Sequence, residues 1–574
     1  MPTSRLRSGV GGTRQTRTVH VVLRFDPAGV ALIPLSDDGA EIGESQIVPK
    51  AELAVHVARL EHDGARWVWD DTARWYPGLL AAGVRVERCV DLRLAHTILR
   101  RSALSSDSEL ARSELNAWDY AATASSTPDV SSALFDLVDD ADDSELADPV
   151  REFQLQRAAI SGSVSSASLG LLLAAESAGA LIAAEMRFAG LPWSVDRHNE
   201  LLVQLLGERP RPGERPAKLE AILRILRDRL DAPDLNPDSP SDLLRALRRT
   251  GMMVTSTRSW HLKEIDHPAI APLLEYKKLS RLLSANGWYW LDSWVRDGRF
   301  RPDYVPGGVV TGRWATSGGG ALQLPKQIRG AVVPDPGWKF IVADAAQLEP
   351  RILAGMSGDS RMAEAGRGDL YEGIVASGAV ATRAEAKLAM LGAMYGATSG
   401  ESGRLLPRLA RAFPKALALV ETAARAGERG EVVSTRLGRS SPLPGADWQQ
   451  TQGEAYGVAA SEVEHKRALS QSRGWGRFTR NFIVQGTAAE WALCWMAGLR
   501  NRLWALEPGS LVDRPHLVFF LHDEVVVHAP AHLAEQVAVE IRAAAVDAGR
   551  LLFGAMPIDF PVTVAIVDSY ADAK

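Results

Sequence analysis

The chain has 574 residues, of which 46% are hydrophobic and 24% charged, an ordinary composition for a soluble globular protein and a length that exceeds one hydrophobic core. Its formal net charge of -5 gives no overall basic signal for a polyanionic partner, although a local basic groove is compatible with that total. The two cysteines, Cys89 and Cys494, are too few for a disulfide framework or a zinc cluster and fit a reducing compartment.

The N-terminal part of the chain is predicted to hold a basic tail, a small mixed domain and an acidic connection. Residues 1–18 are rich in Arg, Gly and Thr and are expected to form a loose tail. Strand-like runs follow at 19–23 and 30–33, with mixed helix and strand up to about residue 100. The segment 102–149 is rich in Ser, Ala and Asp, which is typical of an acidic linker or a poorly ordered insertion. No apolar run is expected to span a bilayer, so we expect a cytoplasmic protein without a membrane partner.

Helix-forming segments dominate the next part of the chain. The run 169–189 ends at Gly190-Leu-Pro192, and further helices are predicted at 217–230, 240–249 and 272–283. The last of these includes the cationic cluster Lys277, Lys278 and Arg281. A solvated helix face is the commoner meaning of such a cluster, and a grip on backbone phosphates is the alternative.

An apolar segment near the C-terminus, residues 517–527, contains His522-Asp-Glu524. If the segment is one continuous strand, Asp523 shares a face with Leu521 and Val525, while His522 and Glu524 share the other. A buried carboxylate then needs a cation to compensate its charge. A hairpin turn that carries the polar residues is the other interpretation, and this segment taken alone leaves both open.

A second strand-terminal acid breaks this tie. The apolar run Phe340-Ile-Val-Ala343 ends in Asp344, and a helix is predicted behind it. Two carboxylates on adjacent strands repel each other unless divalent cations bridge them. Oxygen ligands that share their cation with substrate phosphates suit Mg²⁺.

The segment 382–396 is predicted to form a helix with an unusual stripe. Arg383, Lys387, Leu391 and Tyr395 recur every four residues and therefore lie along one face. Two cations followed by an apolar and an aromatic side chain would suit a triphosphate at one end and a base at the other. An ordinary amphipathic helix with solvated Arg and Lys remains the alternative.

Together these segments resemble family A DNA polymerases, the group of bacterial DNA polymerase I. The blocks that match, in the family's order, are 311–317 with 322–325, 344–351, 383–396, 477–489 and 522–524. The resemblance implies a mixed α/β right-hand polymerase, preceded by an RNase H-like exonuclease-type domain. It places that domain at 19–165, and the polymerase at 166–574 with the thumb at about 200–300, the palm at about 301–360 and 505–574, and the fingers at about 361–500.

The resemblance also implies roles for individual residues. Asp344 and Asp523 would hold two Mg²⁺ ions, for which Mn²⁺ can substitute, and Lys387 would be a proton donor to pyrophosphate. Glu349 would exclude a ribose 2′-hydroxyl. The expected nucleotide-binding residues are Arg383, Lys387, Leu391, Tyr395, Glu349, Gln347 and Tyr371. The expected DNA-binding residues are Arg313, Gln323, Arg477, Asn481, Gln485, His522 and Gly396.

Several positions depart from the family pattern. Leu391 stands where an aromatic residue is usual, and Tyr371 where a histidine is usual. The N-terminal domain lacks the expected Asp-x-Glu, because Asp26 is followed by Pro and Ala. Asp71 and Asp91 are candidate remnants of an exonuclease site, and surface acids are the alternative for each. We therefore expect this domain to be inactive, and we expect no 5′-nuclease domain.

The resulting hypothesis is a monomeric, template-directed DNA polymerase that acts on primer-template DNA and dNTPs in repair or gap filling, in a nucleoid-associated cytoplasmic setting. A polymerase with a working 3′-5′ exonuclease is the first alternative. A catalytically idle DNA-binding module is the second, and the presence of both Asp344 and Asp523 argues against it.

Overall fold

A computed structural model describes residues 19–120, 148–396, 400–455 and 461–573. The predicted basic tail and residues 121–147 of the predicted acidic connection lie outside these described residues. The chain divides into two compact units. The first comprises Met1–Ala184 with Lys387–Leu493, and the second comprises Glu185–Ala386 with Cys494–Lys574.

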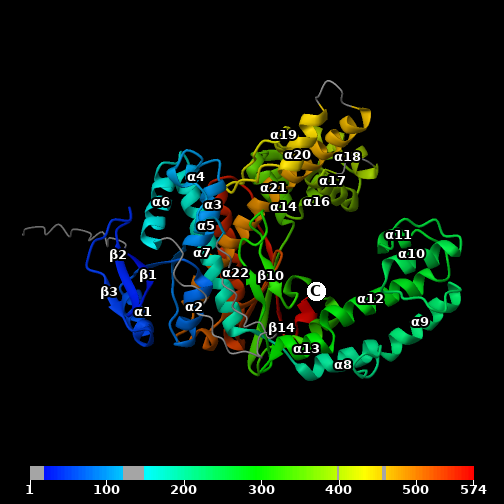
Figure 1. Ribbon diagram of the computed structural model, residues 1–574, viewed down its shortest axis with the longest axis horizontal. Coiled ribbons are helices and arrows are strands. Elements are labelled where there is room, and N and C mark those ends of the chain that lie inside the picture. The colour runs from blue at the N-terminus through cyan, green and yellow to red at the C-terminus, as the bar shows by residue number, and fades with distance from the viewer. Residues whose placement is uncertain (1–18, 121–147, 397–399, 456–460, 574) are drawn as a thin grey trace, which may run out of the picture. The chain divides into compact units, whose positions relative to one another are not determined.

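The N-terminal part of the first unit is a five-stranded mixed sheet, drawn in blue in Figure 1. Its strand order is β3-β2-β1-β4-β5, with β2 antiparallel to its neighbours β1 and β3, and β4 parallel to its neighbours β1 and β5. Apolar residues from the strands and from the helices beside them form the core of this domain, which includes Val22, Ile33, Val68 and Phe153. The strands are β1 (His20–Asp26), β2 (Gly29–Leu35), β3 (Gln46–Val48), β4 (Arg66–Trp69) and β5 (Cys89–Asp91), and the helices are α1 (Leu53–His62), α2 (Thr72–Ala81), α3 (Leu92–Arg101) and α6 (Pro149–Ser161).

The first part of the predicted acidic connection is folded. Residues 102–120 contain the short helices α4 (Glu109–Arg112) and α5 (Ala117–Tyr120). Leu110 and Trp118 are buried, and Trp118 belongs to the core of the sheet domain. Composition alone underestimated this stretch, because a few apolar residues suffice to fix two short helices on an existing core.

Helix α7 (Ser166–Ala189) is long and apolar enough to cross a bilayer by length and composition, contrary to the sequence-based expectation. However, 61% of its most apolar window is buried inside the protein. Glu176 in this helix is 1% exposed and forms an ion pair with Arg439. A buried carboxylate paired with arginine is typical of a helix in a protein core, and the all-round apolar surface of α7 has the same explanation.

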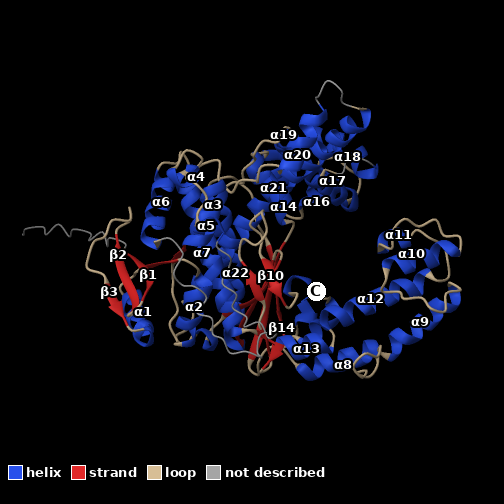
Figure 2. Ribbon diagram, viewed as in Figure 1, coloured by secondary structure: helices blue, strands red, loops and turns tan. Residues whose placement is uncertain are grey.

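The remainder of the first unit is helical, as Figure 2 shows by the scarcity of strands in this part of the chain. Thr479 donates a hydrogen bond to the carbonyl of Ala423, and a side chain at Gly427 would collide with Thr479, so two helices approach closely there. Arg480 donates to the carbonyl of Ala393 at 3.0 Å. The helices are α17 (Arg383–Tyr395), α18 (Gly400–Ala412), α19 (Pro414–Glu428), α20 (Ala446–Ala455) and the long α21 (Glu462–Trp504), of which α17 and α21 continue into the second unit.

Within the first unit, the sheet domain is fastened to the loop that contains Gly438. The Ser102 hydroxyl donates to the Gly438 carbonyl at 2.7 Å, and the Ala103 N–H donates to the Ser440 hydroxyl at 2.9 Å. Gly438 has a φ of +112°, and a Cβ there would lie 2.5 Å from Leu104. Only glycine allows this approach, so the loop and the sheet domain fit one another closely.

The second unit begins with helices in the predicted thumb region. The three helices predicted here, at 217–230, 240–249 and 272–283, agree with the observed bounds to within a few residues, because apolar periodicity marks their extent. Ser194 caps α8 and Ser239 caps α10 through bonds to backbone N–H groups. The elements are α8 (Val195–Leu206), α9 (Ala217–Arg229), α10 (Pro240–Arg249), α11 (Ser259–Leu262), α12 (Ile270–Asn286) and α13 (Trp288–Trp294), with a small sheet of β6 (Leu191–Pro192), β7 (Val295–Arg296) and β8 (Arg299–Phe300).

A four-stranded antiparallel sheet of order β12-β13-β11-β14 supports the predicted palm. Helix α22 packs on this sheet, against β11, β13 and β14. The strands are β11 (Trp338–Ala345), β12 (His516–Leu521), β13 (Glu524–Pro530) and β14 (Val562–Val567), and the helices are α14 (Leu348–Ser357), α15 (Ser360–Ala365), α16 (Leu370–Ala376) and α22 (Ala534–Phe553). Two further strands, β9 (Asp303–Val305) and β10 (Ala315–Gly318), form a separate pair.

Arg351 is a buried hub behind β11. Its side chain is 1% exposed and donates to the carbonyls of Ala346 and Asp559, both at 3.0 Å. It also donates to the carbonyls of Gly366 and Gly368 and to the Gln347 amide oxygen. A guanidinium presents five N–H donors in a fixed fork, so it can hold these sequence-distant segments together.

Replacing Arg351 with Lys should lower the free energy of unfolding by about 3 kcal/mol, because a single ammonium leaves several buried carbonyls without a donor. Urea unfolding followed by circular dichroism measures this change. Arg224→Lys, at an exposed position of α9, is the matched control and should change the free energy of unfolding by less than about 0.5 kcal/mol. Equal free energies of unfolding for both variants would show that the hydrogen bonds of Arg351 do not stabilise the fold.

Candidate active site

The two predicted metal-binding acids lie side by side at one end of the four-stranded sheet. Asp344 is the penultimate residue of β11, and its register partner on β13 is Glu524. The N–H of Ala345 donates to the carbonyl of Asp523 at 3.0 Å. These pairings bring two residues 179 positions apart in sequence onto neighbouring strands at the same sheet end.

The predicted continuous strand through residues 517–527 is wrong, and the hairpin-turn interpretation is correct. Strand β12 ends at Leu521 and β13 begins at Glu524, so His522 and Asp523 form a two-residue turn. His522 has a φ of 60°, which a tight hairpin turn requires of its first central residue. Asp523 therefore does not share a strand face with Leu521 and Val525.

Glu524 faces a buried cluster. It is 2% exposed, accepts a hydrogen bond from the Tyr570 hydroxyl, and lies 3.8 Å from the Arg329 guanidinium. Arg329 also stacks over the Tyr570 ring at 4.3 Å. Burial and then the charge of Glu524 raise the pKa of Tyr570 above its ordinary value, so the hydroxyl stays protonated and donates. Glu524 therefore stabilises the strand that follows the turn.

Tyr304 holds the opposite strand of the hairpin. Its buried hydroxyl donates to the carbonyl of Phe520 at 2.6 Å and accepts from the N–H of the same residue at 3.0 Å. Burial raises the pKa of Tyr304, which keeps the donor in place. Backbone groups on both sides of the Asp523 turn are thus fixed by side chains from elsewhere in the unit.

The pair Asp344 and Asp523 suits a hard divalent cation that retains other ligands. Among the described residues, no group of three or more His, Cys, Asp or Glu is placed to hold a metal ion by itself. Mg²⁺ is commonly bound through one or two carboxylates together with waters and substrate phosphates. The donor set therefore fits Mg²⁺ when a phosphate ligand is also present.

Three further predicted site residues meet beside this sheet end. Arg313 and Glu349 form an ion pair, in which the Glu349 side chain is 15% exposed and that of Arg313 is 36% exposed. Partial burial and then the nearby Arg313 charge lower the pKa of His522, so its imidazole is neutral at physiological pH. The side-chain oxygen of Gln347 accepts hydrogen bonds from the N–H of Leu370 at 2.8 Å and from Arg351, so it is engaged within the protein. The side chain of Gln323 lies outside the described residues.

The predicted stripe on α17 is exposed along its whole length. Leu391 and Tyr395 are 37% and 40% exposed, and Arg383 and Lys387 are also exposed. Ala386, Met390 and Ala393 occupy the buried face of the same helix. The predicted common face is confirmed, and its exposure fits both the nucleotide-binding and the solvated-face interpretation.

A second row of predicted DNA contacts lies on α21. Arg477, Asn481 and Gln485 are four residues apart, and none of them is fully buried. Gly396, which follows α17 with a φ of +75°, packs against Arg477, because a Cβ there would lie 2.8 Å from its Cγ. Gly396 and Arg477 are therefore neighbours within the first unit.

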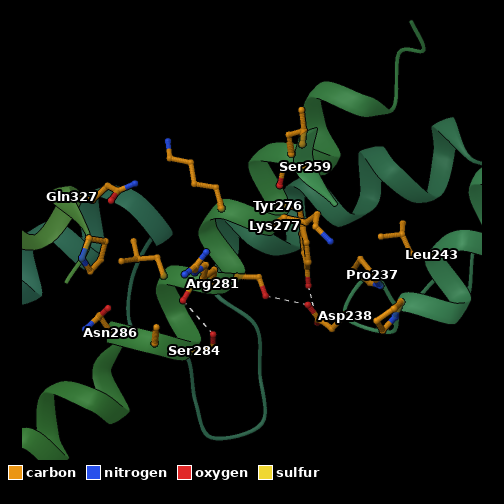
Figure 3. Close-up of a pocket in the computed structure, with 17 residues that line it drawn as sticks. Pro237, Asp238, Leu243, Ser259, Tyr276, Lys277, Arg281, Ser284, Asn286 and Gln327 are labelled. Atoms are coloured by element: carbon orange, nitrogen blue, oxygen red, sulfur yellow. Dashed lines mark hydrogen bonds between the residues drawn. The ribbon is translucent and has the colours of Figure 1, made fainter. Parts of the chain in front are cut away.

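The predicted thumb contains a cavity of about 740 Å³ beside α12 (Figure 3). Lys277, Lys278 and Arg281 belong to its lining. Tyr276 points to Asp238 and donates to it at 2.9 Å, and Ser280 donates to the same carboxylate at 3.0 Å. Burial and then Asp238 raise the pKa of Tyr276 to about 12, so Asp238 fixes the loop before α10 to α12.

The candidate exonuclease acids of the N-terminal sheet form hydrogen bonds and ion pairs within the protein. Asp71 caps α2 by accepting from Ala73 and forms an ion pair with Arg93 at 3.0 Å. Asp91 caps α3 by accepting from Leu94 at 3.0 Å, and it also accepts from the N–H and hydroxyl of Thr72. Burial and then the neighbouring Asp71 raise the pKa of Asp91 to about 6. Asp26 accepts from Ala28 in an exposed turn.

Sequence reasoning missed several residues that shape this site. Tyr304, Arg329 and Tyr570 are isolated in sequence, and no local pattern indicates their contacts with the hairpin. Asp369 lies two positions before Tyr371, and the sequence analysis does not predict its ion pair with Arg383. The only signal in the sequence is an acid 14 residues before the candidate phosphate-binding Arg383.

The comparisons agree with the geometry. Residues 230–571 match the family described as DNA polymerase family A. The thermostable DNA polymerase I of Thermus filiformis is 26% identical over 350 residues, which cover 55% of this chain and 38% of that protein. DNA polymerase I of Pseudomonas aeruginosa is 27% identical over 416 residues, which cover 64% of this chain and 41% of that protein. The chain thus matches about two fifths of the length of these relatives.

A solved structure shows the same fold. It is described as the POL domain of Pol1 from M. smegmatis in complex with DNA primer-template and dNTP. It superimposes with a TM-score of 0.63 at 19% identity and covers 97% of this chain and 96% of its own. The mixed α/β architecture is therefore that of a DNA polymerase I polymerase domain.

Asp91→Ala should lower the free energy of unfolding of the sheet domain by about 2–4 kcal/mol, because it removes a helix cap and leaves buried donors unpaired. Urea unfolding followed by hydrogen exchange of the backbone amides of β4 and β5 measures this change in the sheet domain. Asp26→Ala is the exposed control and should shift the free energy by less than about 0.5 kcal/mol. A destabilisation that appears only in Mg²⁺ would instead indicate a metal-binding role for Asp91.

Proposed function

Because the chain belongs to DNA polymerase family A, we propose that it is a template-directed DNA polymerase that adds deoxynucleotides to the 3′ end of a primer. The observation that supports this most directly is the adjacency of Asp344 and Asp523 at one sheet end, with backbone pairing that holds them there. Family membership rests on residues 230–571, which include both acids.

Asp344 and Asp523 are proposed to hold two Mg²⁺ ions, or Mn²⁺ in their place, together with the phosphates of the nucleotide. Such ions supply charge stabilisation at the reacting phosphorus and lower the pKa of a bound hydroxyl. Tyr304 and Glu524 keep the Asp523 turn fixed, so the carboxylate is positioned before substrate arrives.

The exposed stripe of α17 is proposed to bind the incoming nucleotide. Arg383 and Lys387 bind the triphosphate, and Lys387 donates a proton to the departing pyrophosphate. Tyr395 and Gly396 lie at the template side of the new base pair, and Leu391 provides an apolar surface in place of an aromatic ring. Tyr371 lies beneath Arg383, and Gln347 supports the loop before it.

The remaining predicted residues are proposed to contact DNA. Arg313 and His522 lie near each other, which fits contacts with the primer terminus. The row on α21 and Gln323 fit contacts with the template, and the cations beside the thumb cavity fit backbone phosphates. The solved neighbour, described as a complex with primer-template and dNTP, supports these substrates. We further propose a monomeric enzyme that fills gaps during repair in the nucleoid.

The N-terminal sheet is proposed to be an RNase H-like domain without exonuclease activity. Its strand order, three antiparallel strands followed by two parallel ones, supports the fold assignment. The engagement of Asp71 and Asp91 as helix caps, and of Asp71 with Arg93, supports the loss of activity. Two-metal hydrolysis needs several carboxylates directed at the ions, and cationic neighbours oppose ion binding.

Asp344→Asn or Asp523→Asn should lower the rate of primer extension by at least about a thousandfold while primer-template binding stays within a factor of about two. Single-turnover extension and fluorescence anisotropy measure the two quantities. Asp568→Asn, at the far end of β11 and β14 where Asp568 pairs with Lys339, is the matched control. Normal extension by either active-site variant would refute the assignment, and binding without extension by the unaltered protein would favour the idle module.

Glu349→Ala should raise incorporation of ribonucleotides relative to deoxyribonucleotides by about a hundredfold, since it opens the space for a 2′-hydroxyl. The measurement is kcat/KM for each sugar on the same template. Glu349→Gln keeps the volume and removes the charge that pairs with Arg313, so it should retain most of the selectivity. If both variants lose selectivity equally, the ion pair rather than side-chain volume sets the discrimination.

A mismatched primer end should persist when the protein is incubated with it in Mg²⁺ or Mn²⁺ without dNTPs. Loss of single nucleotides from a labelled 3′ end is the readout, and Asp523→Asn serves as the background for polymerase-dependent pyrophosphorolysis. Degradation that continues in Asp523→Asn and stops in Asp71→Asn would establish a working exonuclease and overturn this part of the proposal.

A further inference from the structure

Arg383, the exposed cation at the start of α17, already has an anionic partner. Its Nη2 and Nε both donate to Oδ2 of Asp369, at 2.8 and 3.2 Å. Its guanidinium lies over the Tyr371 ring, 5.4 Å from the centroid, and Glu372 is 3.8 Å away. The N–H groups of Arg383 that could bind a phosphate therefore already donate to a carboxylate.

Asp369 is held in place independently of Arg383. It caps α16 by accepting from the N–H of Glu372 at 3.0 Å. The loop before it is fastened by Arg351 at the carbonyls of Gly366 and Gly368, and by Gln347 at the N–H of Leu370. Asp369 is thus a fixed counter-charge, whereas Arg383 is on a long side chain that can turn away from it.

Asp369 is ionised in this setting. Partial burial acts to raise its pKa, and the hydrogen bonds from Arg383 and from the N–H of Glu372 outweigh that effect and lower the pKa below its ordinary value. Lys387, one turn further along α17, forms no ion pair within the part of the chain that the structure describes. The two cations of the stripe are therefore unequal before a nucleotide binds.

We propose that Asp369 competes with the incoming nucleotide for Arg383 and thereby sets the affinity of the site for polyphosphates. The inference rests on the proposed polymerase function and deepens it. A triphosphate, with several negative charges that also reach Lys387, can displace one carboxylate from Arg383. Opening the ion pair costs the same free energy for every ligand that takes Arg383, so Asp369 lowers the affinity for a triphosphate by a fixed factor, whereas a monophosphate that does not displace Asp369 binds without Arg383.

The test is Asp369→Asn, which keeps a side-chain oxygen for the α16 cap and removes the charge. Steady-state extension should show a KM for dNTP that is roughly two- to fivefold lower with kcat unchanged, the range expected for an exposed ion pair. Equilibrium titration of dCTP onto the full chain bound to a dideoxy-terminated primer-template should show the same fold-change in Kd. Inhibition by dCMP should strengthen by the same factor or a smaller one, because a single phosphate gains no more from a released Arg383 than a triphosphate does.

Asp359→Asn is the matched control, because Asp359 caps the neighbouring helix α15 through the same type of bond to Met362. It should leave KM, kcat and both affinities unchanged. In an Arg383→Ala background, Asp369→Asn should have no further effect on dCTP binding, since the competed cation is gone.

The results distinguish a failure of the Asp369 proposal from a failure of the proposed polymerase function. Absence of dNTP-dependent extension by the unaltered protein would overturn the proposed function. Extension by the unaltered protein together with an unchanged or higher KM in Asp369→Asn would overturn the competition alone. An effect of Asp369→Asn that persists without Arg383 would overturn it as well, since it would show that Asp369 acts through another group.

Discussion

The geometry of the candidate active site depends on one buried guanidinium. Arg351 binds backbone carbonyls from three segments, the end of β11, the loop at residues 366–368 and the chain before β14, together with Gln347. Through these bonds the residue that follows Asp344 by seven positions also fixes the loop that presents Asp369 to Arg383. A charged group buried in this way is costly unless every donor finds an acceptor. The proposed metal-binding residues and the proposed phosphate-binding residue Arg383 therefore depend on one structural support.

Sequence patterns predicted those features that depend on local periodicity or on an ordered set of motifs. The exposed stripe from Arg383 to Tyr395 followed from its four-residue spacing, and the two acids followed from their place after apolar strands. The turn at His522 was one of two open interpretations, because a two-residue hairpin and a continuous strand give nearly the same apolar pattern. The contacts of Arg351 and Tyr570 join residues far apart in the chain, and single-residue spacing contains no information about such pairs.

The acids of the N-terminal sheet illustrate a second limit. An aspartate at the end of a strand can bind a metal or cap the helix that follows, and its sequence context is the same in both cases. Asp71 and Asp91 each precede a helix, and hydrogen bonds decide that both serve as caps. Asp344 also precedes a helix, but Gln347 stands at its N-cap position, so the carboxylate of Asp344 is not committed to the cap.

The close fit around Gly438 gives the N-terminal sheet a value that is independent of catalysis. Ser102 and Ala103 satisfy polar groups of that loop, and Leu104 fills the space that a side chain at Gly438 would need. A shortened chain that began after the sheet would leave a carbonyl and a hydroxyl of the loop to water and open a hollow over its glycine. Deleting the N-terminal sheet would therefore require a redesign of the loop around Gly438, whatever chemistry the sheet domain performs.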